Sequence, residues 1–214
     1  MSLVRVDCHL HTVASGDAVT TLDQLAERAA RESLDVVFIT DHNEISAAAA
    51  ASDLGVRVIV GEEIRTPDGD IIGLFLTERV PYVLPVAEVV ARIRSQGGLV
   101  YAPHPFDAGR SSLGRVLPGL CAAGAVDIVE VFNAKIETQG PNERAAALAT
   151  AYALPGGAGS DAHDPAGIGA AYLEMPDFDG PADFRAKLRE GRIVGHHADP
   201  HRAWRPRIVP STSA

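Results

Sequence analysis

The sequence predicts an α/β fold in which a sheet closes, or nearly closes, into a barrel covered by helices. Short segments rich in Val and Ile alternate with segments of helical spacing, a pattern typical of parallel strands connected by helices. The number of these units fits a barrel better than an open doubly wound sheet, which is the alternative. With 214 residues and 46% hydrophobic side chains, the chain can bury one substantial core, and a barrel leaves no room for a second domain.

The first unit is a strand followed by a helix. Residues 3–8, LVRVDC, alternate in the manner of a strand. The segment TLDQLAERAARES that follows has its apolar residues at helical spacing, and Thr21 with Gln24 matches a capping box. Further strands are expected at 35–40, 56–60, 70–76, 98–102, 127–132, 156–160, 170–175 and 192–196, and helices in the alanine-rich segment after the second strand and near 85–96, 112–123, 142–153 and 181–190.

We expect residues 1–204 to form a single barrel domain and residues 205–214 to be a frayed tail. The tail contains Pro210 and ends in Ser and Thr residues. The histidine-rich GHHADPHRAWRPR near 195–207 is interpreted as a surface segment outside the site. No role is therefore assigned to His196, His197 and His201.

Composition excludes several classes of protein. The formal net charge is −9 and no run of Lys and Arg stands out, so we expect no duplex nucleic acid as a partner. No apolar run approaches membrane-spanning length and the first residues do not match a signal peptide, which predicts a cytoplasmic protein without a membrane partner. Cys8 and Cys121 are the only cysteines, which argues against a disulfide framework or a thiolate zinc cluster. Cys8 is interpreted as a buried strand residue rather than a nucleophile.

Polar side chains follow most of the predicted strands. They are His9, His11, Asp41, His42, Glu62, Glu63, His104, Glu130, Asp161 and His163. The carboxyl ends of barrel strands meet on one face, so these side chains could surround one small volume. Taken singly, a histidine is more often a surface or core residue and a carboxylate a cap or a solvated charge, but the whole set favours metal binding. Histidine and carboxylate ligands without thiolates suit zinc, manganese or iron.

The motifs DCHLHTVASGD, TDHN, GEEI, APHPF, EVFN and GSDAH occur in this order between residue 7 and about residue 170. As an ordered set they resemble the PHP family, the polymerase and histidinol phosphatase superfamily of metal-dependent phosphoesterases. The resemblance implies a distorted seven-stranded, TIM-like (β/α) barrel. It also implies two or three divalent metal ions at the C-terminal ends of the strands.

The resemblance also implies which residues bind each ion. His9, His11, Glu63 and Asp161 are expected to hold one metal, and Glu63 is expected to bridge to a second that His104 also holds. Asp17, His42 and His163 are the expected third set, and Glu63, Asp161 and His163 are the expected catalytic residues. Glu63 is preferred to Glu62 because the family pattern places a glycine two residues before the ligand. Glu62 and Asp41 are kept as possible additional metal ligands or as residues that support the ligands.

Two positions depart from the family pattern. Asp17 stands where histidine is frequent, which leans the third site toward harder metals such as manganese or magnesium. Many members also supply a histidine to the second site after the EVFN-like strand, and EVFNAKIETQG contains none. Glu130 and Asn133 are the nearby candidates, and the second site is otherwise expected to be depleted or completed by water.

The implied activity is hydrolysis of a small phosphate ester by a hydroxide that bridges two ions. Arg110 and Arg115 are candidate phosphate-binding residues because a guanidinium can hold two phosphate oxygens, although a solvated surface arginine is the more common outcome. One alternative is a metal-binding module without catalysis. Another is an amidohydrolase-like C–N hydrolase, for which Lys135 is the candidate bridging lysine. The small space between GEEI and APHPF leaves little room for a large lid and favours a phosphomonoester of a sugar, an amino alcohol or a nucleotide.

Overall fold

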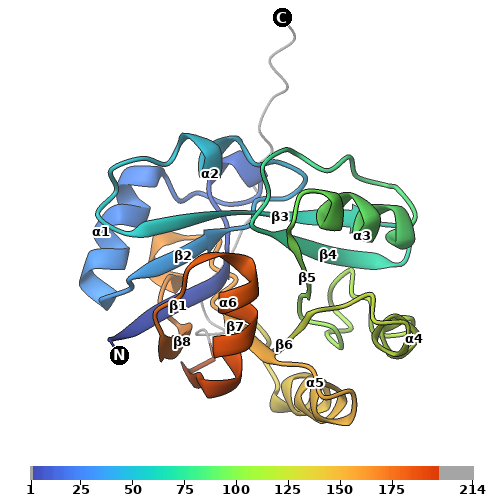
Figure 1. Ribbon diagram of the computed structural model, residues 1–214. Helices are drawn as coiled ribbons and strands as arrows, with labels where there is room; N and C mark the ends of the chain where they lie inside the picture. Colours follow the sequence, from blue (N-terminus) through green and yellow to red (C-terminus); the bar gives the residue numbers. More distant parts are fainter. Residues whose placement is uncertain (1, 198–214) are drawn as a thin grey trace, which may run out of the picture.

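The computed structural model describes residues 2–197, and these residues form one mixed sheet surrounded by helices (Figure 1). The predicted tail at 205–214 and His201 lie outside the described residues. The strands are β1 (Leu3–Leu10), β2 (Val36–Ile39), β3 (Arg57–Thr66), β4 (Gly69–Leu74), β5 (Leu99–Ala102), β6 (Ile128–Asn133), β7 (Gly156–Gly159), β8 (Ala171–Pro176) and β9 (Arg192–Gly195). The α-helices are α1 (Leu22–Glu32), α2 (Ser46–Ala50), α3 (Val86–Ser95), α4 (Leu117–Ala122), α5 (Gln139–Ala151) and α6 (Gly180–Lys187).

The sheet closes into a nearly complete barrel through β1. The strand order is β7-β6-β5-β4-β3-β2-β1-β8-β9. The first half of β1 pairs with β8, whereas its second half meets the residues that follow β7. The amide of Asp161 donates to the His9 carbonyl at 2.7 Å, and the amide of His11 donates to the Ala162 carbonyl at 3.0 Å. The predicted barrel is thus confirmed. Asp161 and Ala162, in the motif GSDAH, lie directly against residues 9–11 at the end of β1.

The expectation of an essentially parallel sheet is wrong at two strands. β4 runs antiparallel to its neighbours β3 and β5, and β8 runs antiparallel to its neighbours β1 and β9. The reason for β4 lies in the turn at 66–69, where the Thr66 hydroxyl donates to the Gly69 carbonyl at 2.6 Å. Gly69 adopts a φ of +134°, which a side chain would not readily permit. So short a connection makes a hairpin, because a parallel crossover needs a dozen or more residues.

The helices follow the sequence pattern with shifted ends. The capping box at the start of α1 is present, with Thr21 and Gln24 bonded to each other's backbone. The predicted helix at 112–123 begins only at Leu117, because Ser112 pairs with Asp70 in an isolated bridge beside the β3–β4 hairpin. Figure 1 shows α6 in front of the strands and the other helices around them. No helix in residues 2–197 is long and apolar enough to cross a membrane.

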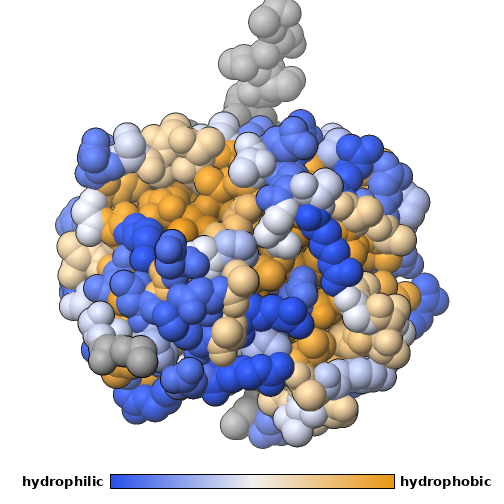
Figure 2. Space-filling view, in the orientation of Figure 1, coloured by the Kyte–Doolittle hydropathy of each residue, from blue (hydrophilic) through white to orange (hydrophobic). Residues whose placement is uncertain are grey.

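The apolar core consists of a barrel interior and outer layers. The barrel interior is filled by Val6, Phe38, Tyr101 and other side chains from seven strands, and α6 adds Phe184 to it. Cys8 is fully buried in the barrel interior, and burial raises the pKa of its thiol well above the ordinary value, in line with a structural residue. Separate outer clusters lie between the sheet and the surrounding helices. Figure 2 shows that the face in front is a mixture of hydrophilic and hydrophobic residues.

Candidate metal centre

The side chains predicted from the strand ends converge in the structure. His9 and His11 come from the end of β1, Glu63 from within β3, and Asp161 from the turn after β7. All of these are buried. His104 follows β5, and His42 and His163 follow β2 and β7. Residues more than 150 positions apart, such as His9 and His163, therefore meet in one volume, because the barrel brings the ends of its strands together.

The first group of donor atoms, which we call the inner cluster site, is formed by His9, His11, Glu63 and Asp161. The Nε2 atoms of the two histidines are 3.1 Å apart. Glu63 Oε2 lies 3.4 and 3.3 Å from them, and Asp161 Oδ1 lies 3.8 and 3.5 Å from them. A tetrahedral zinc ion with ligands at about 2.0–2.1 Å separates its donor atoms by about 3.3–3.4 Å. The four side chains thus fit a single metal ion.

An orphaned atom supports this fit. Asp161 Oδ1 is buried and has no hydrogen-bond partner among the described residues. A buried carboxylate oxygen without a donor is costly, so such an atom calls for a ligand or an ion. Asp161 also adopts a φ of +50°, in the left-handed region. Strained backbone of this kind is found at functional sites, where the surrounding structure enforces it.

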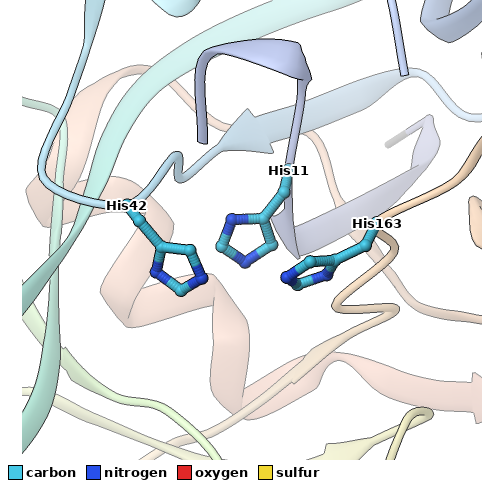
Figure 3. Close-up of side chains that lie close together, drawn as sticks. All are labelled: His11, His42 and His163. Atoms are coloured by element: carbon cyan, nitrogen blue, oxygen red, sulfur yellow. The ribbon is translucent and has the colours of Figure 1, made fainter. Parts of the chain in front are cut away.

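The second group, which we call the outer cluster site, is formed by Asp17, His42 and His163. Asp17 Oδ2 lies 3.3 Å from His42 Nε2 and 3.6 Å from His163 Nε2. The rings of His42 and His163 stand on either side of His11, with centroids 4.5 and 4.2 Å from it, and Figure 3 shows the three rings close together. Both distances from Asp17 suit ligands of one ion, and the nitrogen atoms of His42 and His163 also fall in one group with those of His11 that could hold an ion. His42 links the two sites because its Nδ1 lies 3.1 Å from Glu63 Oε2.

Hydrogen bonds on the far side of the rings set the tautomers of His9 and His11. His9 Nδ1 donates to Glu130 Oε1 at 3.1 Å, whereas His163 Nδ1 lies between the Asp161 carbonyl at 3.0 Å and Lys135 Nζ at 2.8 Å, so its tautomer is not set in this way. His11 Nδ1 donates to the Ser15 hydroxyl at 2.9 Å. A proton held on Nδ1 leaves the Nε2 lone pair free, which is the usual arrangement of histidines that bind metals.

Two of the additional candidates, Asp41 and Glu62, lie outside both groups. Asp41 accepts from the amide and hydroxyl of Thr12 at 2.6 and 2.7 Å and from the Ser15 hydroxyl at 2.7 Å, so it fixes the turn that orients His11. Glu62 points to the opposite face of β3 from Glu63, where its Oε2 accepts from the Val80 amide at 2.7 Å. Burial raises the pKa of Glu62 to about 7.

The other two additional candidates, Glu130 and Asn133, lie directly beside the inner cluster site. Besides His9, Glu130 accepts from the Tyr101 hydroxyl at 3.0 Å, the His104 amide at 2.6 Å and Asn133 Nδ2 at 2.9 Å. Both of its oxygens are thus occupied by donors. Glu130 holds His9 in place rather than facing the centre of the site.

Positive charge adjoins the carboxylates. Arg110 Nη1 donates to Asp161 Oδ2, and Lys135 Nζ lies 3.7 Å from Asp161 Oδ1 and 2.8 Å from His163 Nδ1. Burial alone would raise the pKa of Asp161, but Arg110 and Lys135 outweigh it and hold this pKa well below its usual range. Burial lowers the pKa of Lys135, and burial with the nearby His11 lowers that of His163 to about 4.

These side chains line a cleft with a volume of about 360 Å³. Of the two predicted phosphate-binding arginines, Arg110 lines it, whereas Arg115 is exposed and does not. His196 and His197 do not line it either, and the ring of His197 packs near Phe132. The sequence interpretation did not include Arg65, Asp70 and Ser111, which come from the hairpin and from the loop after β5. The full lining is Asp17, His42, Glu63, Arg65, Asp70, His104, Gly109, Arg110, Ser111, Lys135 and His163.

Comparison with known proteins identifies the class to which this fold and site belong. Residues 7–102 match the PHP domain, and residues 139–193 match the PHP-associated domain. The chain therefore belongs to the PHP family. It is 36% identical to Uncharacterized protein MJ0417 of Methanocaldococcus jannaschii over 196 residues, which cover 87% of this chain and 79% of that protein.

Solved structures show the same fold at low sequence identity. A two-domain protein of Bacteroides vulgatus, described as containing a predicted PHP-like metal-dependent phosphoesterase, is similar with a TM-score of 0.68 and 18% identity. The match covers 91% of this chain and 65% of that protein, so the chain spans less than two thirds of its length. An amidohydrolase of Chromobacterium violaceum is similar with a TM-score of 0.61 and 18% identity, over 89% of this chain and 97% of that one.

Proposed function

We propose that this protein is a metal-dependent phosphoesterase that hydrolyses a small phosphate monoester. One observation carries the proposal: the cleft is lined by the three residues of the outer cluster site, by Glu63 of the inner cluster site, and by the cationic side chains of Arg110 and Lys135. Divalent ions and fixed cations together suit a dianionic phosphate. Membership of the PHP family supports the same reaction class.

The inner and outer cluster sites would each hold a divalent ion, which we propose to be zinc, manganese or iron. When bound, such ions lower the pKa of a coordinated water and neutralise phosphate oxygens. Asp17 gives the outer site one carboxylate and two histidines, a set that suits harder ions than an all-histidine site does. Glu63 lies between the sites and keeps them at a fixed separation.

The fixed cations bind and orient the phosphate. The Arg110 side chain is mostly buried, and Asp161 and Asp107 hold its guanidinium, with 3.6 Å between Arg110 Nε and Asp107 Oδ2. A guanidinium has five N–H donors, so donors remain for phosphate oxygens in the cleft. Lys135 adds a second positive charge beside His163. Because these groups are already in place, their attraction for a phosphate requires little reorganisation.

The size of the cleft supports a small substrate. A volume of about 360 Å³ is at the low end of ligand pockets. The phosphomonoester of a sugar, an amino alcohol or a nucleotide would place its phosphate at Arg110 and its remaining groups toward Arg65 and Ser111, which line the same cleft.

A C–N hydrolase is the second candidate because Lys135 lies in the cleft. A bridging lysine would have to stand between the two ions. In this chain Glu63 already takes that position, since its Oε2 is 3.3 Å from His11 Nε2 and 3.1 Å from His42 Nδ1. The geometry therefore favours phosphate ester hydrolysis, with Lys135 as a cation of the substrate cleft.

The test is hydrolysis of an aryl phosphate, a panel of phosphomonoesters and a panel of amides by the metal-loaded protein. The variant Glu63→Gln should reduce phosphatase activity at least 100-fold, because it removes charge from between the ions. Glu62→Gln is the matched control, since its side chain faces away from the site, and it should retain activity. Bound metal without turnover of any ester would instead support the binding module, and turnover of amides alone would support the C–N hydrolase.

A further inference from the structure

One wall of the cleft is formed by residues that do not belong to the metal centre. Arg65 and Asp70 come from the β3–β4 hairpin, and Ser111 comes from the loop after β5. Arg65 and Asp70 are directly opposite each other in the register of the two strands. Side chains alternate between the two faces of a strand, so Arg65 lies on the same face as Glu63, two residues earlier. The hairpin thus carries this pair on the face that also presents Glu63 to the metal centre.

The Asp70 carboxylate is buried without a strong partner. Only 7% of the side chain is exposed. Within residues 2–197, its one hydrogen bond comes from Arg65 Nε, at a distance of 3.5 Å. Hydrogen bonds between nitrogen and oxygen usually measure about 2.7–3.2 Å, so this long contact leaves most of the acceptor capacity of the carboxylate unused. A buried carboxylate of this kind in the wall of a cleft points to a donor group on a ligand.

The Arg65 guanidinium supplies donors beside this acceptor. The side chain is 61% exposed, and Asp70 is the acidic residue that it contacts within residues 2–197. Asn43 Oδ1 accepts from the Arg65 amide at 2.9 Å, which holds the backbone of Arg65 in place. A guanidinium has five N–H donors, and only Nε is directed at Asp70, so the terminal N–H groups are available to a ligand. The wall therefore offers an acceptor and a donor side by side, and their charges cancel.

Close packing of the hairpin against the loop after β5 keeps this wall in place. The Asp70 amide donates to the Ser111 carbonyl at 2.9 Å. A Cβ atom at Gly69 would lie 2.6 Å from the Ser112 carbonyl oxygen, so only glycine permits this approach. Because the backbone that carries Asp70 is already fixed, binding of a ligand to its carboxylate requires little ordering of the chain.

The chemistry of the wall discriminates among small phosphate esters. A carboxylate or second phosphate on the substrate would be repelled by Asp70, and an ammonium group would be repelled by Arg65 and Arg110. Nucleobases are bound largely by stacking on aromatic side chains, and no Phe, Tyr or Trp of residues 2–197 lines the cleft. A neutral polyol has hydroxyl groups that donate to a carboxylate and accept from a guanidinium. It therefore matches the pair best.

We propose that Arg65, Asp70 and Ser111 form the subsite for the alcohol part of the substrate and select a neutral, polyhydroxylated phosphate monoester, that is, a sugar or polyol phosphate. This inference rests on the proposed function and narrows its substrate class. Asp70 accepts from hydroxyl groups of the substrate and Arg65 donates to them, while the phosphate binds at Arg110. Asp70 and Arg65 thus determine specificity and take no part in cleavage of the ester bond.

Steady-state kinetics of the metal-loaded, full-length protein test this subsite. The substrates are glycerol phosphate as the polyol ester, phosphoethanolamine with an ammonium group, phosphoglycolate with a carboxylate, and phenyl phosphate without hydroxyl groups. Among the first three, we expect the highest kcat/KM for glycerol phosphate. Asp70→Asn should lower this kcat/KM about 10- to 100-fold, the range for loss of a hydrogen bond to a charged group, and leave that for phenyl phosphate unchanged.

Two further variants make the kinetic test specific. Arg65→Gln changes an exposed side chain, so the protein should fold as the wild type does and show a selective loss on glycerol phosphate like that of Asp70→Asn. Asp68→Asn is the matched control, because Asp68 is exposed in the same turn and does not line the cleft, and it should behave as wild type.

Three results would overturn the inference. An equal loss on glycerol phosphate and phenyl phosphate in Asp70→Asn would mean that Asp70 acts through the metal centre. A wild-type preference for phosphoethanolamine would mean that Asp70 binds an ammonium group. A preference for phosphoglycolate would mean that Arg65 binds a second anion.

Binding of a phosphonate separates this inference from the proposed function. In the phosphonate analogue of glycerol phosphate, a methylene group replaces the ester oxygen, so the compound binds but is not hydrolysed. Calorimetry should show about 10- to 100-fold weaker binding to Asp70→Asn than to the wild type, and unchanged binding to Asp68→Asn. Such selective binding without hydrolysis of any ester would leave the subsite standing and refute the phosphoesterase. Hydrolysis of phenyl phosphate without preference for glycerol phosphate would do the reverse.

Discussion

The change Glu130→Gln should disrupt the candidate metal centre without touching a metal ligand. Glu130 Oε1 accepts from His9 Nδ1 and the Tyr101 hydroxyl, and Oε2 accepts from the His104 amide and Asn133 Nδ2. Glutamine has nearly the same shape, but one of the two oxygens becomes an NH₂ group, which only donates. The new amide must therefore turn a donor toward one of these two pairs of donors.

Each orientation has a measurable consequence. If the NH₂ group faces His9, the imidazole must accept at Nδ1 and carry its proton on Nε2, which blocks the atom expected to bind metal. Loss of such an orienting partner lowers metal affinity about 10- to 100-fold. If the NH₂ group faces His104 and Asn133, two buried donors lose their acceptor. At about 1–3 kcal/mol each, the metal-free protein loses about 2–6 kcal/mol of stability.

The assay combines metal titration by calorimetry with urea unfolding in the presence of EDTA, for wild type and Glu130→Gln. Glu27→Gln is the control, because Glu27 is exposed on α1. We expect Glu130→Gln to lose affinity, stability or both by the amounts above, and Glu27→Gln to lose neither. A Glu130→Gln protein with wild-type metal affinity and wild-type stability would refute the view that Glu130 orients the centre.

Two further predictions concern single buried positions. A Cβ atom at Gly159 would lie 2.3 Å from His9 Cβ. Gly159→Ala should therefore destabilise the protein by about 1–3 kcal/mol and weaken metal binding in the same urea and metal titrations. Gly140→Ala is the control, because a Cβ atom at Gly140 meets open space, and it should change neither quantity. Burial raises the folded-state pKa of Glu62 from 4.5 to about 7, so the stability that its neutral form provides is complete below pH 4.5 and is lost as the pH rises through 7. Glu62→Gln should remove this loss of stability, which is worth about 3 kcal/mol at most, and so raise stability at pH 8.5 relative to pH 5. The measurement is urea unfolding at both pH values. The same pH dependence in Glu62→Gln as in the wild type would contradict the raised pKa of Glu62.

The sequence was most informative where local chemistry fixes local structure. The capping box of Thr21 and Gln24 uses contacts within one turn, so its residues alone predict the start of α1. The direction of β4 had a comparable signal, since TPDG at 66–69 is typical of a tight turn between two strands. The alternation of strand and helix along the chain outweighed that signal in the prediction of a parallel strand at 70–76, although no helix separates β3 from β4.

The candidate ligands could be predicted as a set because they follow strands, and a barrel gathers the ends of its strands. The contacts among them could not. Arg110 and Arg115 are five positions apart in one irregular loop, and only the course of that loop decides which of them reaches Asp161. The orientation of Asn133 depends in the same way on carboxylates that are distant in sequence. No local pattern records such contacts, which is why they became visible only in three dimensions.

The most direct test of the metal centre is the anomalous difference density of crystals loaded with Mn²⁺. We expect one peak among His9, His11, Glu63 and Asp161, a second among Asp17, His42 and His163, and each within about 2.0–2.3 Å of its donor atoms. Crystals without a peak among His9, His11, Glu63 and Asp161 would contradict the assignment of this site and, with it, the proposed chemistry.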